Sequence, residues 1–123
     1  MFEVGQGILG KIKYVDGTLP NKNRTYIIVD VSEDGKKIKV LNVSSVKGKE
    51  HKLAFPSNQR LKKYNPPFLR DSFVKLDSLS EVDASDFSSI MILNNGNKLD
   101  CDEMNTIIQG LSAYNTLKCR GTY

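Results

Sequence analysis

Residues 17–45, GTLPNKNRTYIIVDVSEDGKKIKVLNVSS, contain the pattern that decides the fold. Turn-forming residues dominate positions 17–23, and residues 26–31 are then β-branched and aromatic, which is typical of a buried strand. Asp34-Gly35 is a hairpin turn signal, and residues 37–44 begin in strict alternation of charged and apolar side chains. The sequence therefore predicts an antiparallel hairpin at the centre of a sheet.

The hairpin brings one arginine and two hydroxyls to the same end of this sheet. Paired strands in a hairpin run in opposite directions, so the end of the second strand lies beside the start of the first. This places Ser44 and Ser45 near Arg24, which Asn23 and Thr25 flank in sequence. Junctions between a rigid strand and an exposed loop often carry binding or catalytic residues. We expect a polar site here, and a surface salt bridge of Arg24 is the alternative.

The rest of the chain predicts short strands followed by one helix. Further strands are expected at residues 7–15, 53–55, 72–79 and 90–93. Asp100 and Glu103 resemble a capping box, and apolar residues from Met104 to Tyr114 recur at helical spacing, so this helix should pack on the sheet. We predict a mainly β protein with a C-terminal helix, folded as a small and mostly antiparallel barrel.

Length and composition predict one soluble domain over residues 1–123. The chain has 39% hydrophobic and 26% charged residues, which is ordinary for a domain with a single core. It contains no long apolar run, so neither a signal peptide nor a membrane span is expected, and the protein should be cytoplasmic. Two cysteines near the C-terminus match no zinc or disulfide pattern. We therefore expect reduced thiols, no metal site and no cofactor.

The charge is spread unevenly along the chain. Residues 1–70 contain 14 Lys or Arg and six Asp or Glu, whereas residues 71–123 contain four and eight. The first part is thus strongly basic and the second is acidic. A basic segment of this kind indicates an anionic partner such as nucleic acid. An ordinary solvated charged surface is the alternative.

Two later loops carry basic and aromatic residues that suit nucleic-acid binding, and the two consecutive prolines before Phe68 predict that the second of these loops is extended and exposed. The candidate residues in these loops are Lys47, Lys49, His51, Lys62, Lys63, Tyr64 and Phe68. Histidine exchanges protons readily near neutral pH, so His51 is either a general acid or base or a solvated surface residue. Tyr64 and Phe68 would stack on unpaired bases while the lysines hold phosphates. Alternatively, Phe68 plugs the end of the barrel and Tyr64 has no such role.

Three segments of the chain resemble the MazF/PemK/Kid-type toxins of bacterial toxin–antitoxin systems. Residues 17–24 keep the family's spacing from a glycine to an arginine before an apolar strand. Residues 40–45, VLNVSS, look like the family's strand end with a hydroxyl residue. Residues 70–83, RDSFVKLDSLSEVD, are similar to a family motif that begins Arg-Asp-Ser and ends Ile-Asp. The resemblance extends over nearly the whole chain.

The resemblance implies a function and a site. Members of the family are SH3-like barrels that dimerise and cut single-stranded RNA without a metal ion, using the loop arginine and the strand-end hydroxyl. It implies that Arg24 and Ser44 are catalytic, that the chain forms a homodimer, and that an acidic, partly disordered antitoxin binds it. Leu19, Thr25 and Ser80 depart from the family's glutamate, proline and arginine. These departures motivate an alternative, a non-catalytic SH3-like module that binds nucleic acid or a protein such as gyrase, as the related CcdB-type toxins do.

Overall fold

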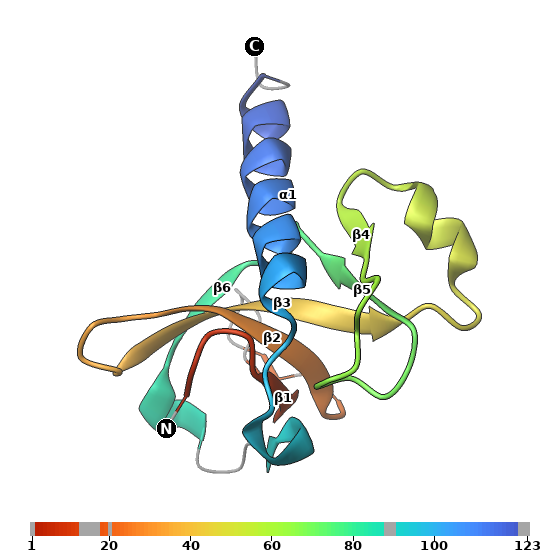
Figure 1. The fold of residues 1–123 in the computed structure, drawn as a ribbon. Coiled ribbons are helices and arrows are strands. Elements are labelled where there is room, and N and C mark those ends of the chain that lie inside the picture. The colour runs from red at the N-terminus through yellow and green to blue at the C-terminus, as the bar shows by residue number, and fades with distance from the viewer. Residues whose placement is uncertain (1, 13–17, 20, 88–90, 121–123) are drawn as a thin grey trace.

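The protein folds into one antiparallel sheet with a C-terminal helix (Figure 1). The computed structural model describes residues 2–12, 18–19, 21–87 and 91–120. The strands are β1 (Gly7–Gly10), β2 (Arg24–Val31), β3 (Lys37–Ser45), β4 (Asn58–Arg60), β5 (Ser72–Lys75), β6 (Ser80–Asp83) and β7 (Met91–Ile92). The helices are the short 3₁₀ helices η1 (Glu50–Ala54), η2 (Ala84–Phe87) and η3 (Leu93–Gly96), and the long α1 (Cys101–Arg120). The prediction of a mainly β chain ending in a helix is confirmed.

The central hairpin is formed by β2 and β3, as predicted. Thr25 lies opposite Val43 and Ile27 lies opposite Leu41, with a bulge in β2 between Ile28 and Asp30. At the turn, Gly35 has a φ of +71°, a value that favours glycine. The strand β3 pairs with β2 along one edge and with both β5 and β6 along the other. It is therefore the strand on which the sheet is assembled.

The sheet is open in the part of the chain that the structure describes. The strands follow the order β4-β5-β3-β2-β1-β7, with β6 also paired to β3, and no ladder joins β4 to β7. These end strands contain only three and two residues, so they offer few backbone groups for pairing across the gap. The closed barrel expected from the sequence is thus not observed.

Both faces of the hairpin are buried. Successive side chains of a strand point to opposite faces, so Ile27 and Leu41 face the same side as α1, whereas Tyr26 and Ile28 face the other. The first side holds a core completed by Phe68, Leu99, Met104 and Ile107, and the second a core completed by Ile8, Ile12, Ile38 and Val40. Burial on both sides explains why residues 26–29 form an uninterrupted apolar run.

The helix α1 begins where the sequence predicts, but only half of the capping box forms. Asp100 Oδ2 accepts the backbone N–H groups of Asp102 at 3.1 Å and Glu103 at 3.3 Å. The Glu103 carboxylate instead accepts the backbone N–H groups of Lys62 at 2.9 Å and Lys63 at 2.5 Å. Figure 1 shows α1 rising from the sheet with its last turns extending beyond the body of the molecule. Glu103 therefore anchors a distant loop to the first turn of this helix.

Several predicted segments differ in detail. Residues 53–54 belong to η1 rather than to a strand, because backbone bonds run locally from Lys52 to Lys49 and from Phe55 to Lys52. The segment around Pro67 and Phe68 is buried rather than exposed, since Phe68 joins the helix-side core. The predicted first strand ends at Gly10, and β5 covers only the first half of residues 72–79. Positions 13–15 and 90 lie outside the described residues.

None of the described helices is both long enough and apolar enough to cross a membrane. The longest of them, α1, contains 20 residues.

Candidate functional site

The hairpin register brings Arg24 and Ser44 together. Arg24 is the first residue of β2, and Ser44 is the second-last residue of β3. Thr25 pairs with Val43, so the same register continued by one residue sets Arg24 opposite Ser44. Side chains directly opposite one another in an antiparallel pair have Cβ atoms about 4.5–5.5 Å apart. The turn and the bulge in β2 together therefore set Arg24 opposite Ser44 rather than Ser45.

A lysine is bonded directly to Ser44. Lys49 Nζ donates a hydrogen bond to Ser44 Oγ at 2.9 Å. The chain returns Lys49 to the strand end through a turn in which Gly48 has a φ of +79°. A hydroxyl group can accept and donate at the same time. The Ser44 oxygen accepts a hydrogen bond from the Lys49 ammonium group, so its own O–H group stays available to donate to another acceptor.

A second lysine reaches the same face from β5. Ser44 pairs with Phe73, and Lys75 lies two residues farther along β5, so both side chains point to one face of the sheet. Burial lowers the pKa of Lys75, and the positive charges of Lys52, Lys49 and Arg24 lower it further, whereas Asp77 raises it. We call Arg24, Lys49, Lys52 and Lys75 the cationic cluster. Like charges this close favour binding of an anion.

Arg24 is not neutralised by any carboxylate in the described part of the chain. The ion pairs observed there join other residues: Lys37 with Glu81, Arg60 with Asp71, Lys63 with Asp100, and Lys98 with Glu3. The Arg24 Nε atom is buried and has no hydrogen-bond partner among the described atoms. A buried donor without an acceptor costs about 1–3 kcal/mol. The salt bridge that was the alternative role for Arg24 is therefore not seen among these residues.

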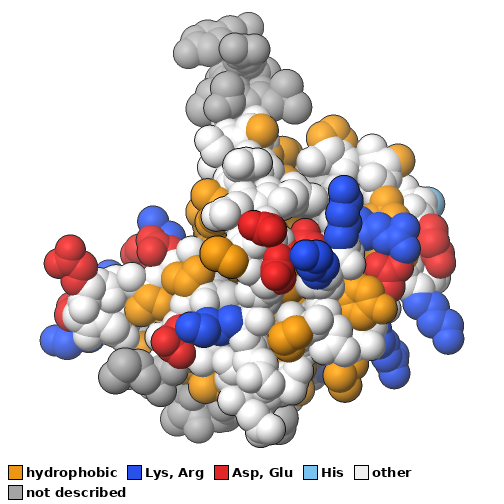
Figure 2. Space-filling model, in the orientation of Figure 1, with side chains coloured by type: hydrophobic (Ala, Val, Ile, Leu, Met, Phe, Trp, Pro, Cys, Tyr) orange, Lys and Arg blue, Asp and Glu red, His pale blue; other side chains and the backbone are white. Residues whose placement is uncertain are grey.

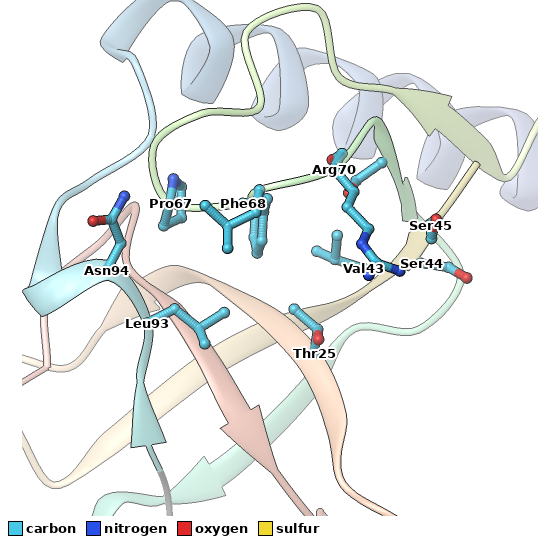
Figure 3. A pocket seen from close by; sticks show the side chains of 11 residues that line it. Thr25, Val43, Ser44, Ser45, Pro67, Phe68, Arg70, Leu93 and Asn94 are labelled. Atoms are coloured by element: carbon cyan, nitrogen blue, oxygen red, sulfur yellow. The ribbon is translucent and has the colours of Figure 1, made fainter. Parts of the chain in front are cut away.

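A pocket of about 470 Å³ lies on the other side of the same strand end. We call it the strand-end pocket. Its lining residues are Thr25, Val43, Ser44, Ser45, Pro67, Phe68, Leu69, Arg70, Ser72, Leu93 and Asn94. Figure 3 shows the Arg70 side chain extending toward Val43 and Ser44, and the Ser44 hydroxyl pointing away from the pocket centre. Ser44 therefore lies at the edge of the pocket and is also bonded to Lys49 of the cationic cluster.

The aromatic and basic candidates of the second loop lie elsewhere. Lys62, Lys63 and Tyr64 line a separate hollow of about 580 Å³, together with Lys98 and Asp100. Leu69 lines both this hollow and the strand-end pocket, so the loop that carries it forms the wall between them. Phe68 is 4% exposed within the helix-side core and contributes to the wall of the strand-end pocket. The second loop thus supplies two surfaces rather than one.

The remaining predicted residues are exposed. Asn23 and Lys47 lie at the surface, and His51 lies at the surface of η1. No hydrogen bond or ion pair joins His51 to Arg24 or Ser44 within the described chain. Leu19, which stands at the position of the family's glutamate, is 54% exposed. His51 is therefore not positioned as a partner of Ser44 in this structure.

Sequence reasoning missed Lys52, Lys75 and Arg70. The alternation of residues 72–79 predicts a strand that contains Lys75. Which residues lie beside Lys75 depends on the pairing of β5 with β3. Figure 2 shows Lys and Arg side chains gathering on the right of the view, over η1 and the end of β3, with acidic side chains among them. Among the described residues, no three His, Cys, Asp or Glu side chains come together as a metal site would require.

Comparison with known proteins finds no family model that matches this chain and no curated protein that matches its sequence.

Proposed function

We propose that the protein binds single-stranded RNA and cleaves it without a metal ion, as an endoribonuclease of the MazF/PemK/Kid type. The observation that carries this proposal is the position of Arg24 opposite Ser44 inside a cluster of four cations. Phosphate is the anion that this arrangement suits, because guanidinium and ammonium groups both bind it through charge-assisted hydrogen bonds. A strand-end site open to solvent accommodates an extended RNA chain.

The reaction would use a nucleophile from the substrate itself. The ribose 2′-hydroxyl loses its proton to a solvent molecule and its oxygen forms a bond to the adjacent phosphorus, while the bond from phosphorus to the 5′-oxygen breaks and that oxygen gains a proton. The products are a 2′,3′-cyclic phosphate and a free 5′-hydroxyl. Negative charge increases on the phosphoryl oxygens in the transition state, and the Arg24 guanidinium would stabilise it. The Ser44 O–H group would donate to a phosphate oxygen, oriented by Lys49.

A lysine would protonate the leaving 5′-oxygen, and the proton of the 2′-hydroxyl would pass to solvent. The position of the family's glutamate is occupied by Leu19, whose side chain has no titratable group. Lys75 is the strongest candidate for the acid that protonates the leaving oxygen, because its pKa is lowered by burial and by neighbouring cations. An acid works best when its pKa lies near the working pH.

The same proposal covers fold and partners. We propose that the sheet is a member of the SH3-like class, that two copies of the chain associate, and that an acidic antitoxin segment occupies the cationic cluster. Charge complementarity supports the last point, because a disordered acidic chain is attracted by clustered lysines and folds as it binds.

A second candidate function is binding without cleavage. It is favoured by one observation: within the described residues, no carboxylate or imidazole is bonded to Arg24 or Ser44. Under this alternative the protein would be a non-catalytic SH3-like module that holds nucleic acid or a protein partner such as gyrase. RNA that is retained in a gel-shift assay but stays intact would favour it.

The decisive experiment incubates the purified protein with a mixed RNA in EDTA, beside Arg24→Ala and Lys36→Ala variants. Lys36 is exposed at the opposite end of the hairpin, so its variant removes one positive charge without touching the site. We expect cleavage by the wild type and the control, and a rate at least about 100-fold lower for Arg24→Ala. Intact RNA in all three samples would exclude the nuclease.

A further inference from the structure

The strand-end pocket has a composition that suits a nucleobase better than a phosphate. Its apolar lining comes from Val43, Pro67, Phe68, Leu69 and Leu93, and Arg70 is the only cation among the lining residues. The cationic cluster on the other side of β3 has the opposite character, with four positive side chains. The volume of the strand-end pocket, about 470 Å³, lies within the range of about 300–1,000 Å³ that is usual for small-ligand pockets.

Arg70 is available for a ligand. The adjacent Asp71 is bonded to Arg60 through two nitrogens of that side chain, and no described carboxylate pairs with Arg70. Arg70 is exposed, and Figure 3 shows it extending toward the Val43 end of the pocket. Its guanidinium therefore presents several N–H donors beside an apolar surface, with no internal acceptor among the described residues.

The backbone that carries Arg70 is held in place. The Arg70 carbonyl accepts a hydrogen bond from Ser72 Oγ at 2.7 Å, and Ser72 is buried. Upstream, Glu103 holds the amides of Lys62 and Lys63, which fixes the start of the same loop. A positioned donor group loses less conformational entropy on binding than a mobile one. The pocket thus has a preformed wall with a single directional cation.

We propose that the strand-end pocket binds a guanine base, and this inference rests on the proposed RNA-binding function. Guanine presents two acceptors, O6 and N7, on one edge, and arginine binds this pair with two parallel hydrogen bonds more often than any other base contact. The oxygens of Thr25, Ser45 and Asn94 would accept the N–H groups of the opposite edge. Leu69, which is 81% exposed at the rim, would cover the face of the base.

The location of Ser44 determines which nucleotide of the RNA would place its base in the strand-end pocket. Ser44 lines the pocket and is bonded to Lys49 of the cationic cluster. A base in the pocket would therefore belong to a nucleotide next to the phosphate held by Arg24 and Ser44. Cleavage would then occur beside a guanosine.

The test separates binding from cleavage by using 2′-O-methyl oligonucleotides, which cannot undergo attack by the 2′-oxygen. Four hexamers that differ in one central base within a uridine background are titrated against the wild type, Arg70→Gln, Arg70→Lys and the Lys36→Gln control. We expect the wild type and the control to bind the guanine hexamer about tenfold more tightly than the others. Both Arg70 variants should lose this preference and retain their affinity for the all-uridine hexamer. Thermal unfolding of each variant confirms that it is folded.

Other results would overturn the inference. An equal loss of affinity for all four hexamers in Arg70→Gln would mean that Arg70 contacts a phosphate. A guanine preference that survives in both Arg70 variants would place recognition elsewhere. If no hexamer binds, the proposed RNA-binding function fails and this inference fails with it. A guanine preference in a protein that leaves unmodified RNA intact would support the pocket and exclude only the catalytic step.

Discussion

The two sides of the end of β3 differ in charge although adjacent residues build them. Ser44 belongs to the side with Arg24, Lys49 and Lys75, whereas Ser45 lines the apolar pocket beneath Arg70. Alternation along the strand is enough to send consecutive side chains into two environments. Phosphates are common to all nucleotides and bases differ among them, so a charged side suits affinity and an apolar side suits selection. Under the proposed function, one strand end would provide both.

The two sides also differ in how they are supported. On the charged side, Arg24, Ser44 and Lys75 are carried by β2, β3 and β5, which are joined by backbone ladders, whereas Lys49 and Lys52 lie at η1. One wall of the pocket is a loop held by Glu103 and by the Arg60–Asp71 ion pair. Ladders keep the first arrangement rigid, whereas the second depends on a few side-chain contacts. Substitutions should therefore separate the two sides.

Ser44→Ala and Ser45→Ala test the largest expected difference between the charged side of the β3 end and the pocket. Loss of the Ser44 hydroxyl removes a donor to the phosphate, so we expect cleavage of every RNA to slow by about tenfold or more. Loss of the Ser45 hydroxyl should slow cleavage beside guanine more than cleavage beside uridine. Initial rates on matched oligonucleotides measure both effects. Equal slowing of all substrates by Ser45→Ala would contradict the division between the two sides.

Glu103→Ala should weaken the pocket and the fold together. The substitution leaves the amides of Lys62 and Lys63 without their acceptor, and bonds to a charged group contribute about 1.5–3 kcal/mol. We expect the free energy of unfolding, measured with urea, to fall by about 2 kcal/mol. Guanine preference should decline, whereas all-uridine binding should change little. Asp102→Ala, an exposed change in the same helical turn, is the control, and an equal loss there would contradict this role of Glu103.

Lys75→Met should change the stability of the fold only slightly, and it acts on the charged side alone. The pKa of Lys75 lies below its ordinary value of 10.5, so between those two values the unfolded chain binds more protons than the folded protein. Stability gained from this group therefore rises with pH across that window, and at neutral pH the charged lysine opposes folding. We expect Lys75→Met to resist urea better than the wild type at neutral pH and low salt, with a difference that narrows toward pH 10.5.

The same variant should bind RNA with less dependence on salt. Removing one phosphate contact lowers the slope of log affinity against log salt concentration by about 0.7 for a single strand. Lys36→Met is the matched control and should keep the wild-type slope. An unchanged slope in Lys75→Met would place Lys75 outside the RNA-binding surface.

The parts of the site that could be predicted from sequence are those set by local pairing. A turn at Asp34-Gly35 and two strands of similar length predict that Arg24 lies near Ser44 and Ser45, whereas the bulge between Ile28 and Asp30, which was not predicted, sets Ser44 directly opposite Arg24. Lys75 could not be assigned to the same face, because its place depends on the register between β5 and β3, which no local pattern encodes.

Competing local patterns explain the other errors. The Asp100–Glu103 spacing fits a capping box, yet the Glu103 carboxylate is bonded to two amides of a distant loop. Two consecutive prolines predicted an exposed loop before Phe68, whereas burial of that ring in the core decides its course. In both cases a tertiary contact overrides a pattern that is correct for an isolated segment.

The contact of the Glu103 carboxylate with the amides of Lys62 and Lys63 has a consequence for the order in which the chain folds. It joins residues 40 and 41 positions apart in the chain, whereas Thr25 and Val43 of the hairpin are close in sequence. Closing a longer loop costs the chain more conformational entropy, so contacts between distant residues form later. During synthesis, the hairpin with Arg24 and Ser44 can pair before α1 has left the ribosome, and the wall that carries Arg70 is secured only afterwards. Selectivity would therefore be the last property that a new chain acquires.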